Sequence, residues 1–272
     1  MLKIEDIHEI QELELALLKN VADFCEAHDF RYFMVGGTLL GAVRHQGFIP
    51  WDDDIDIAMP RPDYDRFLES YADGNYKVLH IGNCSSYAYP FAKVVDTRTF
   101  LVEKDMVQTE CPELGLNIDI YPMDGVKDLS VGTRKKMRKQ AVFAHRLGFA
   151  LPPKKGSGIL DFLKRWFWVL RFAVPGRKWY YSRLNRQLRS TPFDSSAYVT
   201  SAFGRRCEKE IVPSSAFTAF VRMSFERESF RAPAGYGLYL EQMYGDYMQL
   251  PPPEQRVANH STKIFWRKDA ES

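Results

Sequence analysis

The spacing of apolar residues predicts a mixed chain in which helices alternate with short strands. Between residues 3 and 28, apolar side chains recur every three or four positions, as one face of an amphipathic helix requires. Shorter runs that are apolar or alternating predict strands. The predicted helices are 3–28, 38–45, one that opens at Pro62, several between 131 and 190, and 235–246; the predicted strands are 31–36, 55–59, 76–81, 88–95, 100–104 and 116–122.

One stretch, residues 36–60, combines this alternation with acidic residues: GGTLLGAVRHQGFIPWDDDIDIAMP. In a strand, Asp54 and Asp56 would share one face while Ile55 and Ile57 share the other. Neighbouring carboxylates repel each other, and a divalent cation removes that repulsion. Hard oxygen ligands suit Mg²⁺ or Mn²⁺, and such ions commonly bridge to phosphate. An acidic run by itself is more often a solvated loop, so the interpretation depends on the residues before it.

The residues before the acidic pair predict contacts with phosphate. Gly36 and Gly37 follow an apolar strand, and glycine lets backbone amides approach phosphate oxygens closely. Thr38 opens a short helix that ends near Arg44, whose guanidinium suits bidentate contact with phosphate. Because glycines, helix, arginine and D-x-D occur in this order, we predict that these four residues bind substrate.

A third carboxylate and two further cations complete the predicted site. Asp119 lies inside the alternating strand of LGLNIDIYPMDG, where it can share a face with carboxylates of a neighbouring strand. Asp124 is the alternative, although we expect it to cap the following turn. Lys93 and Arg98 either hold the phosphates of an activated donor or form surface ion pairs. The predicted metal ligands and catalytic residues are Asp54, Asp56 and Asp119.

Composition favours an ordinary intracellular protein. The 272 residues are 45% hydrophobic, enough for one large domain or two small ones. Its apolar runs all fall short of the ~20 residues that span a bilayer, and the N-terminus lacks the pattern of a cleavable signal. Four scattered cysteines without C-x-x-C spacing argue against a zinc site or a disulfide framework. We therefore expect a cytoplasmic location.

The net charge of +2 conceals a strong segregation of charge. Residues 127–189 carry 17 Lys and Arg against two acidic residues, whereas the remainder carries 20 basic and 33 acidic residues. Such segregation indicates an anionic partner, or a solvated helix face. Within residues 154–178, apolar side chains recur at helical spacing with cations on their flanks. This segment is either a helix lying on an anionic membrane or a helix packed on the core with its cations in water.

With these motifs in view, the chain resembles the LicD family of phosphocholine transferases, within the nucleotidyltransferase-fold superfamily. The resemblance rests on MVGGTLLGAVRHQGFIPWDDDIDIAMPRPDYDRF, YPFAKVVDTRT, NIDIYPMDG and YLEQMYGDYMQLPPPEQR, and covers most of the chain apart from its basic middle. It implies an α+β fold with a mixed sheet flanked by helices. We predict a catalytic core at 1–130, a basic helical insertion at 131–190, and a mixed C-terminal part at 191–272 that completes the same domain.

The resemblance also implies an activity. We expect Mg²⁺- or Mn²⁺-dependent transfer of a phospho-alcohol, foremost phosphocholine, from a CDP-alcohol donor to a glycan or lipid-linked polysaccharide acceptor such as a teichoic acid precursor, with release of CMP. The metal pair maps to Asp54 and Asp56, the later strand aspartate to Asp119, and the glycine signature to Gly36 and Gly37. Nucleic acid is not an expected partner. Alternatives are transfer of a nucleotide onto a small-molecule hydroxyl and an inactive binding module, and the intact aspartates argue against the second.

Overall fold

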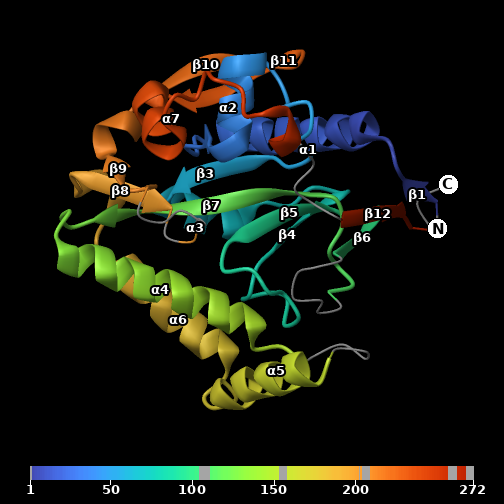
Figure 1. The fold of residues 1–272 in the computed structure, drawn as a ribbon, viewed down its shortest axis with the longest axis vertical. Coiled ribbons are helices and arrows are strands. Elements are labelled where there is room, and N and C mark those ends of the chain that lie inside the picture. Colours follow the sequence, from blue (N-terminus) through green and yellow to red (C-terminus); the bar gives the residue numbers. More distant parts are fainter. Residues whose placement is uncertain are drawn as a thin grey trace.

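The computed structural model describes residues 2–103, 111–152, 158–201, 203, 209–256 and 262–267. They form an α+β fold in which a mixed sheet separates two groups of helices (Figure 1), as the sequence predicted. The main sheet contains, in spatial order, β2 (Phe33–Met34), β3 (Asp56–Pro60), β7 (Asn117–Val126), β5 (Ala92–Asp96) and β4 (Tyr76–Leu79), with β8 (Tyr198–Ser201) and β9 (Val212–Pro213) attached to β7.

Strand β7 organises the sheet because it pairs with three other strands. It runs parallel to β3 and antiparallel to β5 and β8. The β5 pairing uses the first half of β7, and the β8 pairing uses its second half. The pairing with β8 explains why the strand continues to Val126, four residues beyond its predicted end at 122.

Helices and one hairpin cover the two sides of this sheet. Figure 1 shows α1, α2, α7 and the β10–β11 hairpin on one side, and α4, α5 and α6 on the other. The bounds are α1 (Ile7–Ala27), α2 (Gly36–His45), α3 (Arg61–Ser70), α4 (Val131–Phe149), α5 (Ile159–Arg171), α6 (Arg177–Leu188), β10 (Phe220–Phe225), β11 (Glu228–Pro233) and α7 (Tyr236–Tyr244).

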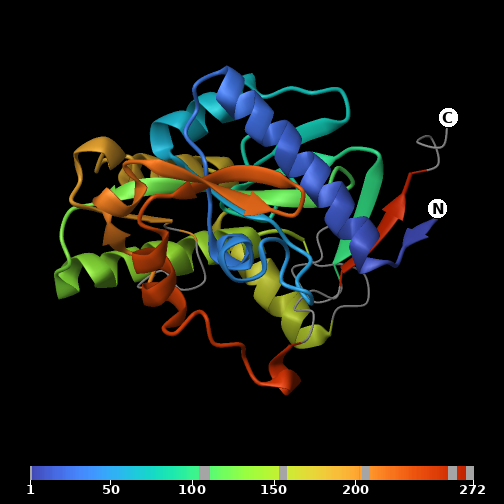
Figure 2. The same ribbon diagram turned by 90° about the horizontal axis from the view of Figure 1, so that it is seen from above.

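Both ends of the described chain meet in a second, three-stranded sheet. Its strands are β1 (Lys3–Ile4), β12 (Thr262–Trp266) and β6 (Thr99–Glu103). Figure 2 shows β1 and β12 side by side at one edge of the molecule. Lys3 and Ile4 were predicted to be helical, which is wrong: they are extended because they pair with Phe265 and Ile264. Lys104, the last residue of the predicted strand 100–104, lies outside the described residues.

The hydrophobic core draws on distant parts of the chain. The main cluster contains buried side chains from residues 4–123 and again from residues 193–264. Two smaller clusters lie where α4, α5 and α6 meet each other and the sheet. The three-part division of the chain given above stays a prediction. No described helix is both long and apolar enough to cross a membrane.

Asp124 does not cap a turn, contrary to expectation. It is buried in the second half of β7, where its carboxylate accepts hydrogen bonds from Arg61 Nε at 2.8 Å and Nη2 at 2.6 Å. Asn185 of α6 accepts a further hydrogen bond from the same guanidinium at 3.1 Å. The buried ion pair therefore connects α3, β7 and α6.

Candidate active site

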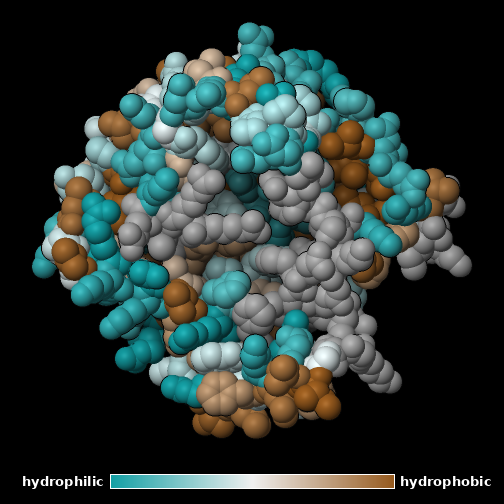
Figure 3. Space-filling model, viewed as in Figure 1, coloured by the Kyte–Doolittle hydropathy of each residue, from teal (hydrophilic) through white to brown (hydrophobic). Residues whose placement is uncertain are grey.

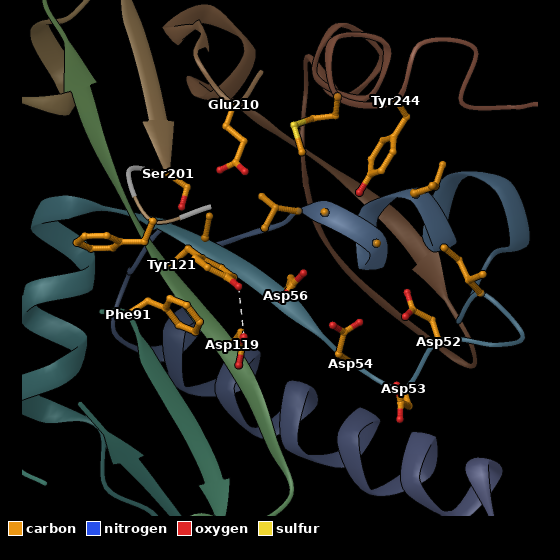
Figure 4. A pocket seen from close by; sticks show the side chains of 18 of the residues that line it. Asp52, Asp53, Asp54, Asp56, Phe91, Asp119, Tyr121, Ser201, Glu210 and Tyr244 are labelled. Carbon is orange, nitrogen blue, oxygen red and sulfur yellow. Dashed lines mark hydrogen bonds between the residues drawn. The ribbon is translucent and has the colours of Figure 1, made fainter. Parts of the chain in front are cut away.

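A cavity of about 1340 Å³ opens along the edge where β3 and β7 begin. Its walls come from the start of α2, from β3, β5 and β7, from α4, and from residues between 201 and 256. Eight acidic side chains line this cavity: Glu14, Glu210, Asp246 and five aspartates between residues 52 and 119. Figure 4 shows the five aspartates in the order Asp52, Asp53, Asp54, Asp56 and Asp119, with Tyr121 and Phe91 beyond Asp119 and Glu210 and Ser201 facing them across the cavity.

Three neighbouring strands place the central charges side by side. Asp56 on β3 is in register with Asp119 on β7, and Asp119 is in register with Lys93 on β5. In-register side chains of adjacent strands point to the same face. Along β7, buried Ile118 and Ile120 alternate with residues that face the cavity, Asp119 among them. As the alternation in the sequence predicted, Asp119 therefore faces the cavity while its isoleucine neighbours are buried.

Electrostatic repulsion is built into this face. The pKa of Asp56 is raised well above its usual value, first by burial and then by the charges of Asp54 and Asp119. Glu14, which reaches the cavity from α1, has its pKa raised well above the usual range by burial and then by Asp54 and Asp53. These carboxylates disfavour each other's ionisation, and a bound cation would favour it.

The glycine turn packs against the same carboxylates. Gly36 has φ +58°, a left-handed conformation that favours glycine, and a Cβ there would lie 2.8 Å from Asp56 Oδ2. A Cβ on Gly37 would lie 2.8 Å from Asp52 Oδ2. The Thr38 hydroxyl accepts a hydrogen bond from the Asp56 backbone N–H at 2.8 Å and does not belong to the cavity wall. Thr38 thus positions Asp56.

The predicted cations have different surroundings. Lys93 forms an ion pair with Asp119, donates to Asn117 Oδ1 at 2.8 Å, and lies in the cavity wall. Arg44 also lines the cavity, and its Nη1 donates to the Tyr247 carbonyl at 3.1 Å. Its Nε is buried and makes no hydrogen bond within the described part of the chain. Lys93 and Arg44 are therefore both placed next to the acidic cluster.

Arg98 is not brought to the cavity. It follows the C-terminal end of β5, opposite the end that carries Lys93, and its Nη2 donates to Asp96 Oδ2 at 2.6 Å. The guanidinium also lies 5.8 Å from the ring centre of Trp266 on β12. Arg98 thus sits among residues that join β5 to the smaller sheet, away from the cavity.

Several cavity residues had no place in the sequence prediction. Glu14 could have been noticed, because it and Gln11 are polar residues on the buried face of an otherwise apolar helix. Gln11 Nε2 donates to the Asp52 carbonyl at 2.9 Å and so fixes the acidic loop. Glu210 and Tyr239 come from the C-terminal part: Glu210 lies outside the quoted motifs, and Tyr239 opens the motif at 239–256 but was given no role. The Tyr239 hydroxyl accepts a hydrogen bond from the Gly36 N–H at 3.2 Å.

These residues fit a hard divalent cation. All the acidic groups offer oxygen, the donor that Mg²⁺ and Mn²⁺ prefer. Glu14 Oε2 is buried without a hydrogen-bond partner among the described residues, and a nearby cation would stabilise its charge. Within the same residues no three Asp, Glu, His or Cys side chains already converge as ligands of one ion, and Asp119 is held by Lys93. Asp54 and Asp56 lie in the same cavity, and the charge of Asp54 raises the pKa of Asp56, so these two are the first candidates to hold the ion.

Comparison with known proteins identifies the family. The nucleotidyltransferase domain described as LicD/FKTN/FKRP matches residues 29–175, more than half of the chain. The chain belongs to this family. The resemblance drawn from the motifs is confirmed, and the protein is a LicD-type phosphotransferase.

Two relatives with assigned activities extend this result. The lipopolysaccharide cholinephosphotransferase LicD of Haemophilus influenzae is 29% identical over 277 residues, covering 94% of this chain and 97% of the relative. The human ribitol 5-phosphate transferase FKRP is 35% identical over 115 residues, 39% of this chain and 20% of the relative. The first similarity extends over nearly the whole chain, whereas the second is local.

Proposed function

We propose that this protein transfers phosphocholine from a CDP-activated donor to a hydroxyl of a cell-surface glycan or teichoic acid precursor, releasing CMP. The observation that carries the proposal is the row of Asp56, Asp119 and Lys93 on adjacent strands, with Asp54 beside it. The cavity around this row is large enough for a nucleoside diphosphate donor and an acceptor. Similarity to a cholinephosphotransferase over 94% of the chain supports phosphocholine as the transferred group.

The cavity offers separate places for the parts of such a donor. The pyrophosphate would lie against the acidic row, with a Mg²⁺ or Mn²⁺ ion held by Asp54 and Asp56 and joined by Asp119. When bound, this ion neutralises the pyrophosphate and the leaving CMP. Arg44 also lines the cavity, and its guanidinium would provide a positive charge for a phosphate. The CDP donor and the metal are parts of the proposal.

An aromatic wall suits the choline head. Tyr89, Phe91 and Tyr121 line the cavity, with ring centres 5.6 Å apart for the first pair and 4.3 Å apart for the second. Lys93 Nζ already lies 4.6 Å from the centre of the Tyr89 ring, so this wall tolerates a cation at close range. Aromatic faces attract quaternary ammonium ions over similar distances.

The reaction needs one substitution at phosphorus. The acceptor oxygen attacks the phosphorus that bears choline, the bond from that phosphorus to the bridging oxygen breaks, and the bridging oxygen leaves on CMP. The acceptor's proton passes to a carboxylate of the cavity, for which we propose Asp119 because it lies beside the aromatic end, away from the glycine turn. Catalysis then consists mainly of positioning and charge stabilisation.

The proposal is tested by incubating the protein with Mg²⁺ and CDP-choline, CDP-ribitol or CDP-glycerol, with and without glycan acceptors, and measuring CMP by chromatography. We expect CMP release that is fastest with CDP-choline, requires the metal, and disappears in Asp54→Asn. Asp194→Asn is the matched control, because that aspartate is exposed and pairs with Arg31 outside the cavity.

Other outcomes would point elsewhere. Release of pyrophosphate from a nucleoside triphosphate, with the nucleotide attached to a small-molecule hydroxyl, would indicate nucleotidyl transfer. Preference for CDP-ribitol would keep phospho-alcohol transfer and reject choline. Binding of CDP-choline without turnover under any acceptor or metal condition would indicate a binding module.

A further inference from the structure

The outer face of α5 is apolar and exposed. Five of its apolar side chains, on Ile159, Leu160, Leu163, Phe167 and Leu170, are between 60% and 78% exposed. In Figure 3 the brown, hydrophobic residues gather at the lower edge of the molecule, where Figure 1 places α5. Exposed apolar patches of this kind mark interaction surfaces in folded proteins.

The opposite face of α5 holds the helix to the protein, and it is the more polar face. Arg165 is buried and forms a salt bridge of 2.7 Å with Asp161, one turn earlier. Trp168 stacks on buried Phe172 with ring centres 5.8 Å apart, and Arg146 of α4 lies 5.1 Å from the Trp168 ring. The helix is thus anchored with Arg165 and Trp168 toward the protein and most of its apolar side chains outward.

This orientation disagrees with the simpler interpretation of the sequence in one respect: most of the apolar face does not pack on the core, although Lys164 and Arg171 do face water. A helix at the surface of a soluble protein normally turns its apolar face toward the core, whereas α5 turns most of its apolar face outward. Residues 154–157, which begin the segment predicted to contact either membrane or core, lie outside the described residues. The outward apolar face therefore belongs to residues 159–171, the helix α5 itself.

Cations border the apolar face. Lys164 and Arg171 are exposed and lie seven residues apart, on one margin of the row formed by Leu160, Leu163 and Phe167. Residues 158–178 contain five Lys and Arg against one acidic residue, Asp161, which is already paired with Arg165. An apolar face bordered by positive charge is complementary to an anionic lipid surface, where acyl chains and headgroups meet.

We propose that the outer face of α5 binds the surface of an anionic membrane. The helix lies in the plane of the headgroups, with Leu163 and Phe167 inserted between lipids and Lys164 and Arg171 among the phosphates. A protein partner would also bury apolar residues, but the cationic margin favours lipid. The interaction does not depend on the proposed reaction, and it would hold the cavity next to acceptors carried at such a surface.

The test is co-flotation of the full-length protein with vesicles of phosphatidylcholine alone or mixed with phosphatidylglycerol. We expect binding only to the mixed vesicles, and partial release as ionic strength rises. Leu163→Ser/Phe167→Ser should lower the vesicle partition coefficient by about tenfold or more, because both apolar side chains that would be buried among the lipids are removed. Lys164→Glu/Arg171→Glu should weaken binding to the mixed vesicles and remove its dependence on salt.

Leu2→Ser/Phe220→Ser is the matched control, because both side chains are exposed, at 64% and 48%, but lie on the N-terminal segment and on β10. It should bind vesicles like the wild type. All variants change exposed residues and should keep the wild-type melting temperature. The proposal is overturned if the wild type ignores anionic vesicles, or if both double variants on α5 bind them normally. A change in oligomeric state on light scattering without vesicle binding would also overturn it, in favour of self-association.

Discussion

At Asp56 the stability of the fold and the chemistry of the site oppose each other. Burial and the charges of Asp54 and Asp119 raise the pKa of Asp56 above that of an unfolded aspartate. A carboxyl group whose pKa is raised on folding destabilises the native state once the unfolded chain ionises. The penalty grows as pH rises from the unfolded value toward the folded one, and is then constant. At neutral pH the metal-free protein therefore keeps this carboxyl group buried at a cost in stability, because the unfolded chain is then ionised.

This cost leads to the first prediction. Asp56→Asn should abolish turnover and yet raise Tm in metal-free buffer at neutral pH, by about 2–4 °C for each kcal/mol relieved. Below the pKa of unfolded aspartate the gain should vanish, because both states are then protonated. Differential scanning fluorimetry in EDTA across this pH range measures the effect, with Asp194→Asn as control. A lower Tm at neutral pH, or turnover near that of the wild type, would show that Asp56 is not a strained ligand.

A second prediction concerns Lys93, which neutralises Asp119 in the structure. Lys93→Met leaves Asp119 beside Asp56 without its partner, and breaking a buried pair in this way costs about 3–5 kcal/mol, less where the cavity admits water. Mg²⁺ should then recover part of the loss, so that the rise in Tm on adding Mg²⁺ exceeds that of the wild type. Melting curves with and without Mg²⁺ measure it.

The control for this experiment is Lys93→Met/Asp119→Asn, which removes both charges. It should be more stable than Lys93→Met without metal and should lose the extra response to Mg²⁺. An equal Mg²⁺ response in wild type and Lys93→Met would mean that Asp119 takes no part in binding the ion.

For single residues, the sequence was enough to predict cavity residues that alternate along a strand. It was not enough for residues whose position depends on contacts between elements. Asp54, Asp56 and Asp119 were found because period-two alternation fixes the face of a strand. Arg98 was included with Lys93 because both flank Asp96, but the chain turns after β5 and carries it to the smaller sheet. Glu14 was missed because nothing local shows which cavity an inward carboxylate will reach.

At the scale of elements, one buried ion pair connects β7 to two helices. Arg61 opens α3, Asp124 lies in β7, and Asn185 lies in α6, and all three are buried. The pKa of Arg61 is raised above its usual value despite burial, chiefly through Asp124. The bidentate geometry satisfies both carboxylate oxygens, which is the condition under which a buried pair is tolerated.

The third prediction follows from this arrangement. Arg61→Met should destabilise the protein by about 3–5 kcal/mol, because Asp124 stays buried without its partner. Arg189→Met should change stability by less than about 1 kcal/mol, because its pair with Asp65 is exposed to solvent. Chemical denaturation of the two variants measures the difference. Comparable losses in both would mean that the buried pair contributes no more than a surface pair.

The helices were predictable and the minor strands were not, for one physical reason. Helical periodicity is local, so the ranges of α1, α2 and α7 were close to correct. The β10–β11 hairpin was missed because β10 is largely exposed and shows little alternation. For α5 the amphipathic pattern was recognised. Such a pattern does not show which face turns outward, because that depends on how the helix packs against α4 and α6.

At the scale of the molecule, the cavity is assembled from both ends of the chain. The family domain matches residues 29–175, yet Glu14 precedes that range, and Ser201, Glu210 and Tyr239 follow it. The Tyr239 hydroxyl even contacts the glycine turn directly. The motif at 239–256 marked one C-terminal segment of the cavity wall, but a motif does not show which of its residues face the cavity, and Ser201 and Glu210 lie outside every quoted motif.

The last prediction is that residues 1–190 do not fold alone. Removing residues 191–272 deprives β7 of its partner β8 and the core of apolar side chains that are almost wholly buried. Six of them, each worth about 1.5–3 kcal/mol, would forfeit as much as the typical net stability of about 5–15 kcal/mol. These six are Phe193, Val199, Val212, Phe217, Phe225 and Leu240.

The fragment should therefore lack a cooperative thermal transition and near-ultraviolet circular dichroism, and co-expression with residues 191–272 should restore both, together with turnover. A fragment that melts cooperatively at the full-length Tm would show instead that the N-terminal part is an independent unit. In that case the C-terminal residues would only complete the cavity, and they would not be needed to hold the sheet that carries Asp56 and Asp119.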